Sequence, residues 1–158
     1  MTAVMTGQVD AMGGYYTTQV GQIEEQTKKK AAHFRYVDFG VNALSQGLLI
    51  HTRRLSEPDL NRRMVRASSR AWAEAARNPD EAARSLVEMF PKAGRVELNL
   101  KQWRDTIDLM STPSSRGKAP GWMAGADWET LLGLQRTYGN IQTRSPDEYY
   151  TNEFFDCT

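Results

Sequence analysis

The sequence has few of the residues that bind metals or form cross-links. It contains one cysteine, Cys157, and two histidines, His33 and His51, which lie far apart along the chain. A single thiol cannot form a disulfide within the chain, and these three residues make no zinc-binding pattern. We therefore expect no metal and no cofactor, and cysteine usage does not indicate a redox compartment.

The sequence also lacks an excess of one charge and any long apolar run. Its 158 residues include 20 Lys and Arg against 19 Asp and Glu, a balance that does not favour nucleic acid or an anionic membrane surface as a partner. No stretch approaches the roughly 18 apolar residues of a membrane span, and "MTAVMTGQVD" at the start lacks the pattern of a signal peptide. With 40% hydrophobic and 25% charged residues, the chain has the composition of a globular domain.

Motifs of catalysis are absent as well. The sequence has no Gly-x-Ser-x-Gly elbow, no Walker loop, no Gly-x-Gly-x-x-Gly and no His-Glu-x-x-His. Most carboxylates fall in first turns of predicted helices, where capping and the helix dipole account for them. A nucleophilic Cys157 would need a base that the sequence does not place near it. These absences favour a binding protein over an enzyme, and we predict no catalytic residue.

The first third of the chain alternates predicted strands with a helix. Strands are predicted at Val9–Met12, at "HFRYVDF" (33–39) and at "ALSQGLLIHT" (43–52), because these stretches alternate or are compactly apolar. A polar helix is predicted over Thr17–Lys30, with its lysines at the C-terminal end. This order predicts an α/β fold with a sheet.

Three helix starts are marked by a capping residue, a proline and a carboxylate. They are "SEPD" (56–59), "NPDE" (78–81) and "SPDE" (145–148). The helix from the second of these starts should end at Phe90, because a proline follows. Amphipathic spacing from Val96 predicts a further helix, and "WMAGADWETLLGLQRTYGNI" predicts one with Gly139 just past its end. The predicted buried side of that last helix consists of Trp128, Leu131, Leu132 and Tyr138.

The stretch "GQVDAMGGYYTTQ", Gly7 to Gln19, combines flexible backbone with flat side chains. Its strand runs into two glycines, which allow close backbone approach, and two tyrosines, which offer an amphipathic surface. Two interpretations follow. The segment is either the wall of a ligand site or an ordinary strand-to-helix turn with packed aromatic residues.

Several segments, taken in order, resemble a known family. "TGQVDAMGGYY", "YVDFGVNALSQGLLIHTRRL", "NRRMVRASSRAWAEAARNPDEAARSLVEMFP", "GWMAGADWETLLGLQRTYGNI" and "YYTNEFF" are similar to the C-terminal half of substrate-binding proteins of ABC transporters. The most similar group binds nitrate, sulfonates and taurine or the thiamine pyrimidine. The resemblance implies part of a two-lobed periplasmic-binding-protein type II fold. In that fold helices cover a parallel or mixed sheet, and the N-terminal half is expected to be missing.

The resemblance also implies a division of the chain. Residues 1–40 would be the end of the second lobe, with the ligand-wall turn and the start of the hinge. Residues 41–158 would be the crossover strand and the helical C-terminal part of the first lobe. Because half a fold exposes apolar sheet surface and strand edges, we expect self-association into an oligomer or strand exchange. The full-length protein would be periplasmic or extracytoplasmic, with its targeting signal in the missing start.

The ligand-binding residues that the resemblance implies lie in the turn and at the hinge. Gln19 stands where pyrimidine binders are expected to carry a glutamate, so the ligand is not named. Asp38 would either face the cleft or only cap its turn. The predicted set is Gly13, Gly14, Tyr15, Tyr16, Gln19, Asp38 and Asn42.

Three functions are consistent with these observations. The first is a solute-binding protein that delivers a small organic molecule to an ABC transporter permease. The second is an enzyme similar to the thiamine-pyrimidine synthases, although their active histidine and cysteine-rich segment have no counterpart here. The third is an effector-binding or regulatory domain of the same fold, although no DNA-binding helix pair is recognisable.

Overall fold

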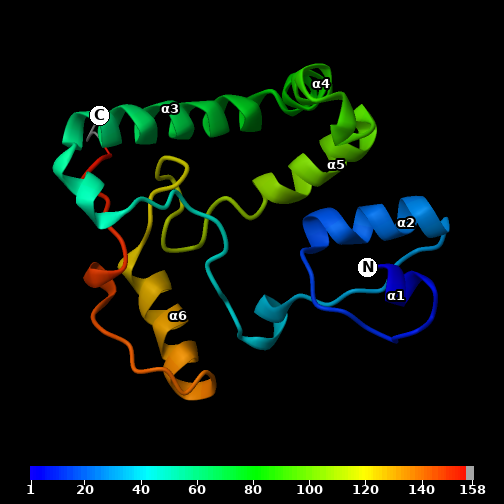
Figure 1. Cartoon of the computed structure of the whole chain (residues 1–158), viewed down its shortest axis with the longest axis horizontal. Coiled ribbons are helices and arrows are strands. Elements are labelled where there is room, and N and C mark those ends of the chain that lie inside the picture. Colours follow the sequence, from blue (N-terminus) through cyan, green and yellow to red (C-terminus); the bar gives the residue numbers. More distant parts are fainter. Residues whose placement is uncertain (156–158) are drawn as a thin grey trace. The chain divides into compact units, whose positions relative to one another are not determined.

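The structure is a computed structural model that describes residues 1–155. Over this range the chain forms helices joined by irregular segments, and no strand is present (Figure 1). The predicted parallel or mixed sheet is therefore wrong. Within "HFRYVDF" only Tyr36–Phe39 is regular, as the 3₁₀ helix η2, and residues 41–50 have no regular structure. The alternation fits a strand, but a strand also needs a neighbour to take its backbone hydrogen bonds, and no described segment does so.

The chain divides into two compact units. The first unit contains residues 1–38 and 78–109, and the second contains residues 39–77 and the chain from residue 110 onwards. Each unit therefore combines two separate stretches of sequence. The assignment of residues 1–40 and 41–158 to two lobes stays a prediction.

The first unit contains the predicted polar helix and two of the later helices. The polar helix begins as a π-helical turn, η1, and continues as α2, while the helix predicted to end at Phe90 ends one residue earlier. Gly21 is buried where these two segments join, and a Cβ there would lie 3.2 Å from Leu98 Cδ1 of α5. The helices are α1 (Thr2–Met5), η1 (Tyr16–Val20), α2 (Gly21–Thr27), α4 (Pro79–Met89), η4 (Pro91–Ala93) and α5 (Val96–Ile107).

The second unit contains the longest helix and the glycine-terminated one. The predicted starts at Pro58 and Pro79 are confirmed, whereas the start at Pro146 gives only a single 3₁₀ turn. The residues after that turn do not extend it, because the rings of Tyr149 and Tyr150 instead stack on Trp128. The helices are η3 (Thr52–Ser56), α3 (Pro58–Arg77), α6 (Gly125–Tyr138) and η5 (Pro146–Glu148).

The apolar core of the described residues is small. Ala83 is buried in the first unit, and Ala124, Leu132 and Phe154 are buried in the second. The burial of Leu132 confirms part of the prediction for the buried side of α6, but Tyr138, which was predicted on the same side, is 81% exposed. That residue ends the helix, whereas the buried residues of α6 lie in its first two turns.

The segment 149–155 is tied to the chain that precedes α6. The Asn152 side chain accepts a hydrogen bond from Met123 N at 3.1 Å and donates one to Met123 O at 2.7 Å. Phe154 is buried nearby in sequence, and the Phe155 ring lies beside Gly121. We call this arrangement the C-terminal clasp.

Candidate functional site

The tyrosine-containing turn, residues 13–19, is closed by one of its own side chains. Tyr15 is extended and precedes η1, and its backbone N–H donates to Gln19 Oε1 at 2.7 Å. The Thr18 hydroxyl donates to the same oxygen at 2.8 Å. A Cβ on Gly14 would lie 3.3 Å from Gln19 Cδ, so the glycine leaves room for this side chain to fold back. Gln19 therefore fixes the backbone of the turn.

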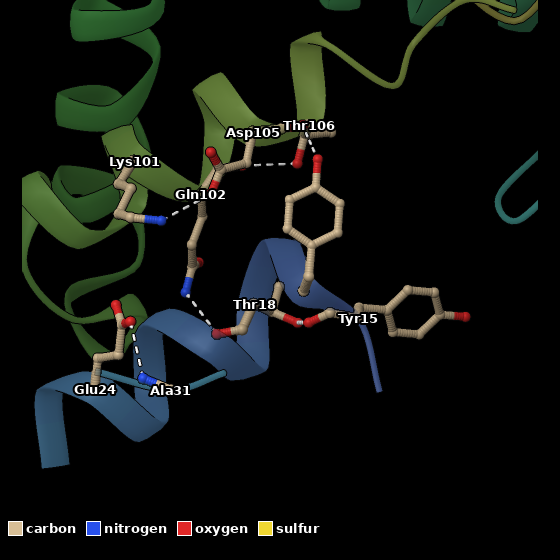
Figure 2. A network of polar contacts seen from close by, with 9 residues as sticks. Tyr15, Thr18, Glu24, Ala31, Lys101, Gln102, Asp105 and Thr106 are labelled. Carbon is tan, nitrogen blue, oxygen red and sulfur yellow. Dashed lines mark hydrogen bonds and ion pairs between the residues drawn. The ribbon is translucent and has the colours of Figure 1, made fainter. Parts of the chain in front are cut away.

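Helix α5 also holds the turn in place through hydrogen bonds. Gln102 Nε2 donates to Thr18 O at 3.5 Å, and the Tyr16 hydroxyl donates to Asp105 O at 3.4 Å. Figure 2 shows this network, in which Gln102 reaches from α5 to the start of the polar helix, while the Thr106 hydroxyl donates to Gln102 O within α5. The turn is therefore held both within itself and by a helix about eighty residues further along the chain.

The two adjacent tyrosines lie in different surroundings. Tyr16 is half-buried, and its ring stacks on His33 with centroids 5.7 Å apart and planes 1° apart. Tyr15 is 58% exposed, and its ring points away from the network (Figure 2). Tyr16 is thus a packed aromatic residue, and Tyr15 offers an open flat surface.

A second segment of the first unit reaches the turn. Besides the stacking of His33 on Tyr16, the hydroxyl of Tyr36 lies 3.9 Å from the place that a Cβ on Gly13 would occupy. Tyr36 is also exposed. Two exposed tyrosines, Tyr15 and Tyr36, therefore flank the two glycines. The absence of a side chain at Gly13 keeps the space in front of the Tyr36 hydroxyl open.

An exposed ion pair stands beside these rings. Arg35 Nη2 lies 2.8 Å from Asp38 Oδ1, and Arg35 Nε donates to Oδ2 at 3.3 Å. The Arg35 hydrogen bond holds the pKa of Asp38 below its usual range. The same contact raises the pKa of Arg35, and the Tyr16 hydroxyl acts in the same direction. The Asp38 N–H also donates to Arg35 O, so Asp38 closes a turn, while a cleft-facing role for it stays a prediction.

Sequence reasoning missed His33, Arg35 and Tyr36 as neighbours of the turn. A strand would have placed Arg35 and Asp38 on opposite faces, since successive side chains alternate. In the 3₁₀ geometry, residues three apart lie one above the other, which brings this pair together. The available signal was the opposite charge of two residues at that spacing.

Asn42 belongs to a different unit from the other six predicted residues. It is exposed and belongs to the second unit, whereas Gly13 through Asp38 belong to the first. Its neighbours Val41 and Ala43 help to line a hollow of about 370 Å³ along α6, together with residues such as Leu131. The role of Asn42 in the site stays a prediction.

Two kinds of feature are absent from residues 1–155. In this range no three His, Cys, Asp or Glu side chains are grouped so that they would hold a metal ion. Among the same residues no helix combines the length and apolarity needed to cross a bilayer. Cys157 lies outside the described residues.

Comparison with known proteins identifies the family. A family model described as NMT1/THI5 like matches residues 1–82, which is more than half of the chain. The chain therefore belongs to the NMT1/THI5 like family, and its resemblance to the nitrate, sulfonate, taurine and thiamine-pyrimidine binding proteins is confirmed. The matched range includes all seven predicted site residues. No curated protein and no solved structure matches the chain.

Proposed function

We propose that this chain is part of an extracytoplasmic solute-binding protein. It holds a small organic molecule against the turn at residues 13–19, for delivery to the membrane permease of an ABC transporter. The family match over residues 1–82 supports the class of protein. The observation that carries the location of the site is the exposed ring of Tyr15 on a turn whose backbone is fixed by Gln19.

The surroundings of Tyr15 suit a flat ligand that carries an acceptor or a negative charge. An aromatic ring stacked on a flat ligand contributes about 0.5–1.5 kcal/mol beyond simple burial, and a fixed backbone lowers the ordering cost of binding. Tyr36 offers a second exposed ring and a hydroxyl beside Gly13. Arg35 adds a cation that interacts with the Tyr16 hydroxyl, and its exposed pair with Asp38 leaves the guanidinium accessible to a ligand.

A ligand screen tests this proposal. The chain is heated with nitrate, taurine, an alkyl sulfonate or a methylpyrimidine, and the melting temperature is measured. A ligand at a hundred times its dissociation constant should stabilise the protein by about 2.7 kcal/mol. Tyr15→Ala should weaken binding of the active compound while leaving the ligand-free melting temperature unchanged. The matched control is Tyr138→Ala, because Tyr138 is 81% exposed on α6, outside the predicted site. Equal binding by wild type and Tyr15→Ala would overturn the proposed location.

A substitution at residue 19 should affect the binding of two ligand classes in opposite directions. Gln19 presents a neutral oxygen that already accepts two hydrogen bonds, and Gln19→Glu supplies the carboxylate expected in pyrimidine binders. If the ligand is an aminopyrimidine, Gln19→Glu should tighten binding through a charge-assisted hydrogen bond. If the ligand is nitrate or a sulfonate, the new negative charge should weaken it. Isothermal titration of both proteins with the compound found in the screen measures the direction.

A further inference from the structure

Asp38 occupies one edge of the Arg35 guanidinium. Arg35 Nη2 lies 2.8 Å from Asp38 Oδ1, and Arg35 Nε donates to Asp38 Oδ2 at 3.3 Å. Two parallel hydrogen bonds of this kind are also the way in which arginine binds the oxyanion group of a ligand. The Asp38 carboxylate therefore takes the position that a ligand anion would need on this edge.

This ion pair can open without disturbing the backbone around it. The side chains of Arg35 and Asp38 are 45% and 48% exposed, and such exposed pairs contribute little because water solvates both partners. The Asp38 N–H donates to Arg35 O at 3.0 Å, so the turn is closed by the main chain. A rotation of the Asp38 side chain would therefore free the guanidinium and leave the turn intact.

Arg35 has a second partner that belongs to the predicted site. The Tyr16 hydroxyl interacts with the guanidinium, and the same hydroxyl donates to Asp105 O of α5 at 3.4 Å. Tyr16 is half-buried, and its ring stacks on His33. This tyrosine is thus fixed from two sides. If Asp38 leaves, Arg35 keeps a partner that holds it beside the turn at residues 13–19.

We propose that Asp38 is a specificity-determining residue, which occupies the anion-binding edge of Arg35 until the oxyanion of a ligand displaces it. This inference rests on the proposed function and names the ligand class as an organic anion, such as a sulfonate or a carboxylate. An anion restores both hydrogen bonds that Arg35 loses from Asp38. A neutral ligand has no charge with which to compete, so it leaves the pair in place.

Isothermal titration with ethanesulfonate tests this competition. Asp38→Asn should bind the sulfonate about two- to fivefold more tightly than wild type, because the competing charge of an exposed ion pair is removed. The matched control is Asp59→Asn. It removes the carboxylate of another arginine–aspartate pair three residues apart, Arg62 with Asp59 at 3.4 Å on α3, and it should bind like wild type. Binding of a neutral methylpyrimidine should be the same in all three proteins.

The outcomes separate this inference from the proposed function. Equal or weaker sulfonate binding by Asp38→Asn overturns the inference, because the anion then does not compete with this carboxylate. If only the methylpyrimidine binds, the inference is wrong and the proposed function stands. If Asp38→Asn tightens sulfonate binding but Tyr15→Ala does not weaken it, the inference stands and the proposed location fails. If neither compound binds to any of the proteins, both are wrong.

NMR of the Asp38 carboxyl group tests the displacement directly. The hydrogen bond from Arg35 lowers the pKa of Asp38, and the charges of Arg35 and His33 act in the same direction. With ethanesulfonate bound, the Asp38 titration should move up toward its ordinary value, because Arg35 then pairs with the sulfonate. The sulfonate stays ionised in acid, and His33 is present in both states. A midpoint that stays low in the saturated protein would show that Asp38 has not left Arg35, which overturns the inference.

Discussion

The turn at residues 13–19 and the exposed strip at residues 41–50 contrast in how they are held. The turn is polar and aromatic, yet Gln19 closes it and α5 contacts it. The strip is apolar, yet most of its side chains are exposed, and its described backbone groups make no backbone hydrogen bond. A segment of this chain is held in place by contacts with a neighbouring surface, and its hydrophobicity alone does not hold it. Within residues 1–155 the turn contacts α5 of its own unit, whereas most side chains of the strip stay exposed.

The largest expected effect comes from filling two glycines, Gly21 just after the turn and Gly47 in the strip. Gly21→Leu should destabilise the chain by about 1–3 kcal/mol, because a Cβ at that position already lies 3.2 Å from Leu98 Cδ1 and a larger side chain overpacks the contact with α5. Gly47→Leu should cost nothing, since no atom lies within 4 Å of its Cβ position. Urea unfolding of both variants measures the difference. Equal losses would show that the two segments are packed alike.

A smaller effect is expected from the tyrosines. Tyr16→Ala removes the stacking on His33 and the hydrogen bond to Asp105 O, so we expect a loss of about 1–2 kcal/mol. Tyr15→Ala should change the free energy of unfolding by less than about 0.5 kcal/mol, because an exposed ring contributes little to stability. Urea unfolding checks both values, and a larger loss for Tyr15→Ala than for Tyr16→Ala would reverse the assignment of packed and open rings.

Replacing one glutamine in each region should affect only the turn. Gln19→Ala should cost about 0.5–1.5 kcal/mol, since the Tyr15 N–H and the Thr18 hydroxyl lose their acceptor. Gln46→Ala should have no measurable effect on the unfolding of monomeric protein at low concentration, because Gln46 is exposed. Amide hydrogen exchange at Tyr15 should accelerate only in Gln19→Ala. An unchanged exchange rate would mean that the turn does not depend on this side chain.

The smallest effect is expected from acid. The pKa of Asp38 is lowered in the folded chain by its hydrogen bond to Arg35, so the pair stabilises the fold above the ordinary pKa of an aspartate. That contribution is lost as the pH falls through the lowered pKa of the folded state. In Arg35→Gln the Asp38 titration, followed by NMR, should move up toward its ordinary value. A titration midpoint that does not move would show that the ion pair is not formed in solution.

The helices were predictable because their signals are local. A proline and a carboxylate in the first turn mark where α3 and α4 begin, and Gly139 follows the end of α6 as expected. These features depend on a few consecutive residues and on the geometry of a helix end. The third proline signal, at Pro146, gives only a single 3₁₀ turn. The chain after it packs against α6 instead, where the Tyr150 ring stacks on Trp128.

The strands and the surroundings of the turn could not be predicted in this way. A strand depends on a second segment whose position no short stretch encodes, so alternation in "HFRYVDF" predicted a strand where a 3₁₀ helix forms. The same error hid the contact between Arg35 and Asp38, and it hid Tyr36 as a neighbour of Gly13. The turn itself was recognisable, because glycines and tyrosines are adjacent in sequence and the family resemblance covers them.

The C-terminal clasp links the backbone of Met123 to a segment that lies about thirty residues later in the chain. Asn152 contacts both backbone groups of Met123, much as a neighbouring strand would. Detachment of the last turn of chain therefore uncovers an amide some thirty residues earlier. Proteolytic cleavage before Asn152 would remove the hydrogen-bond partner of that amide. The segment that leads into α6 would then lose its contact with the clasp. The hydrogen-exchange rate of the Met123 amide, measured during digestion, would show whether the second unit stays folded after cleavage.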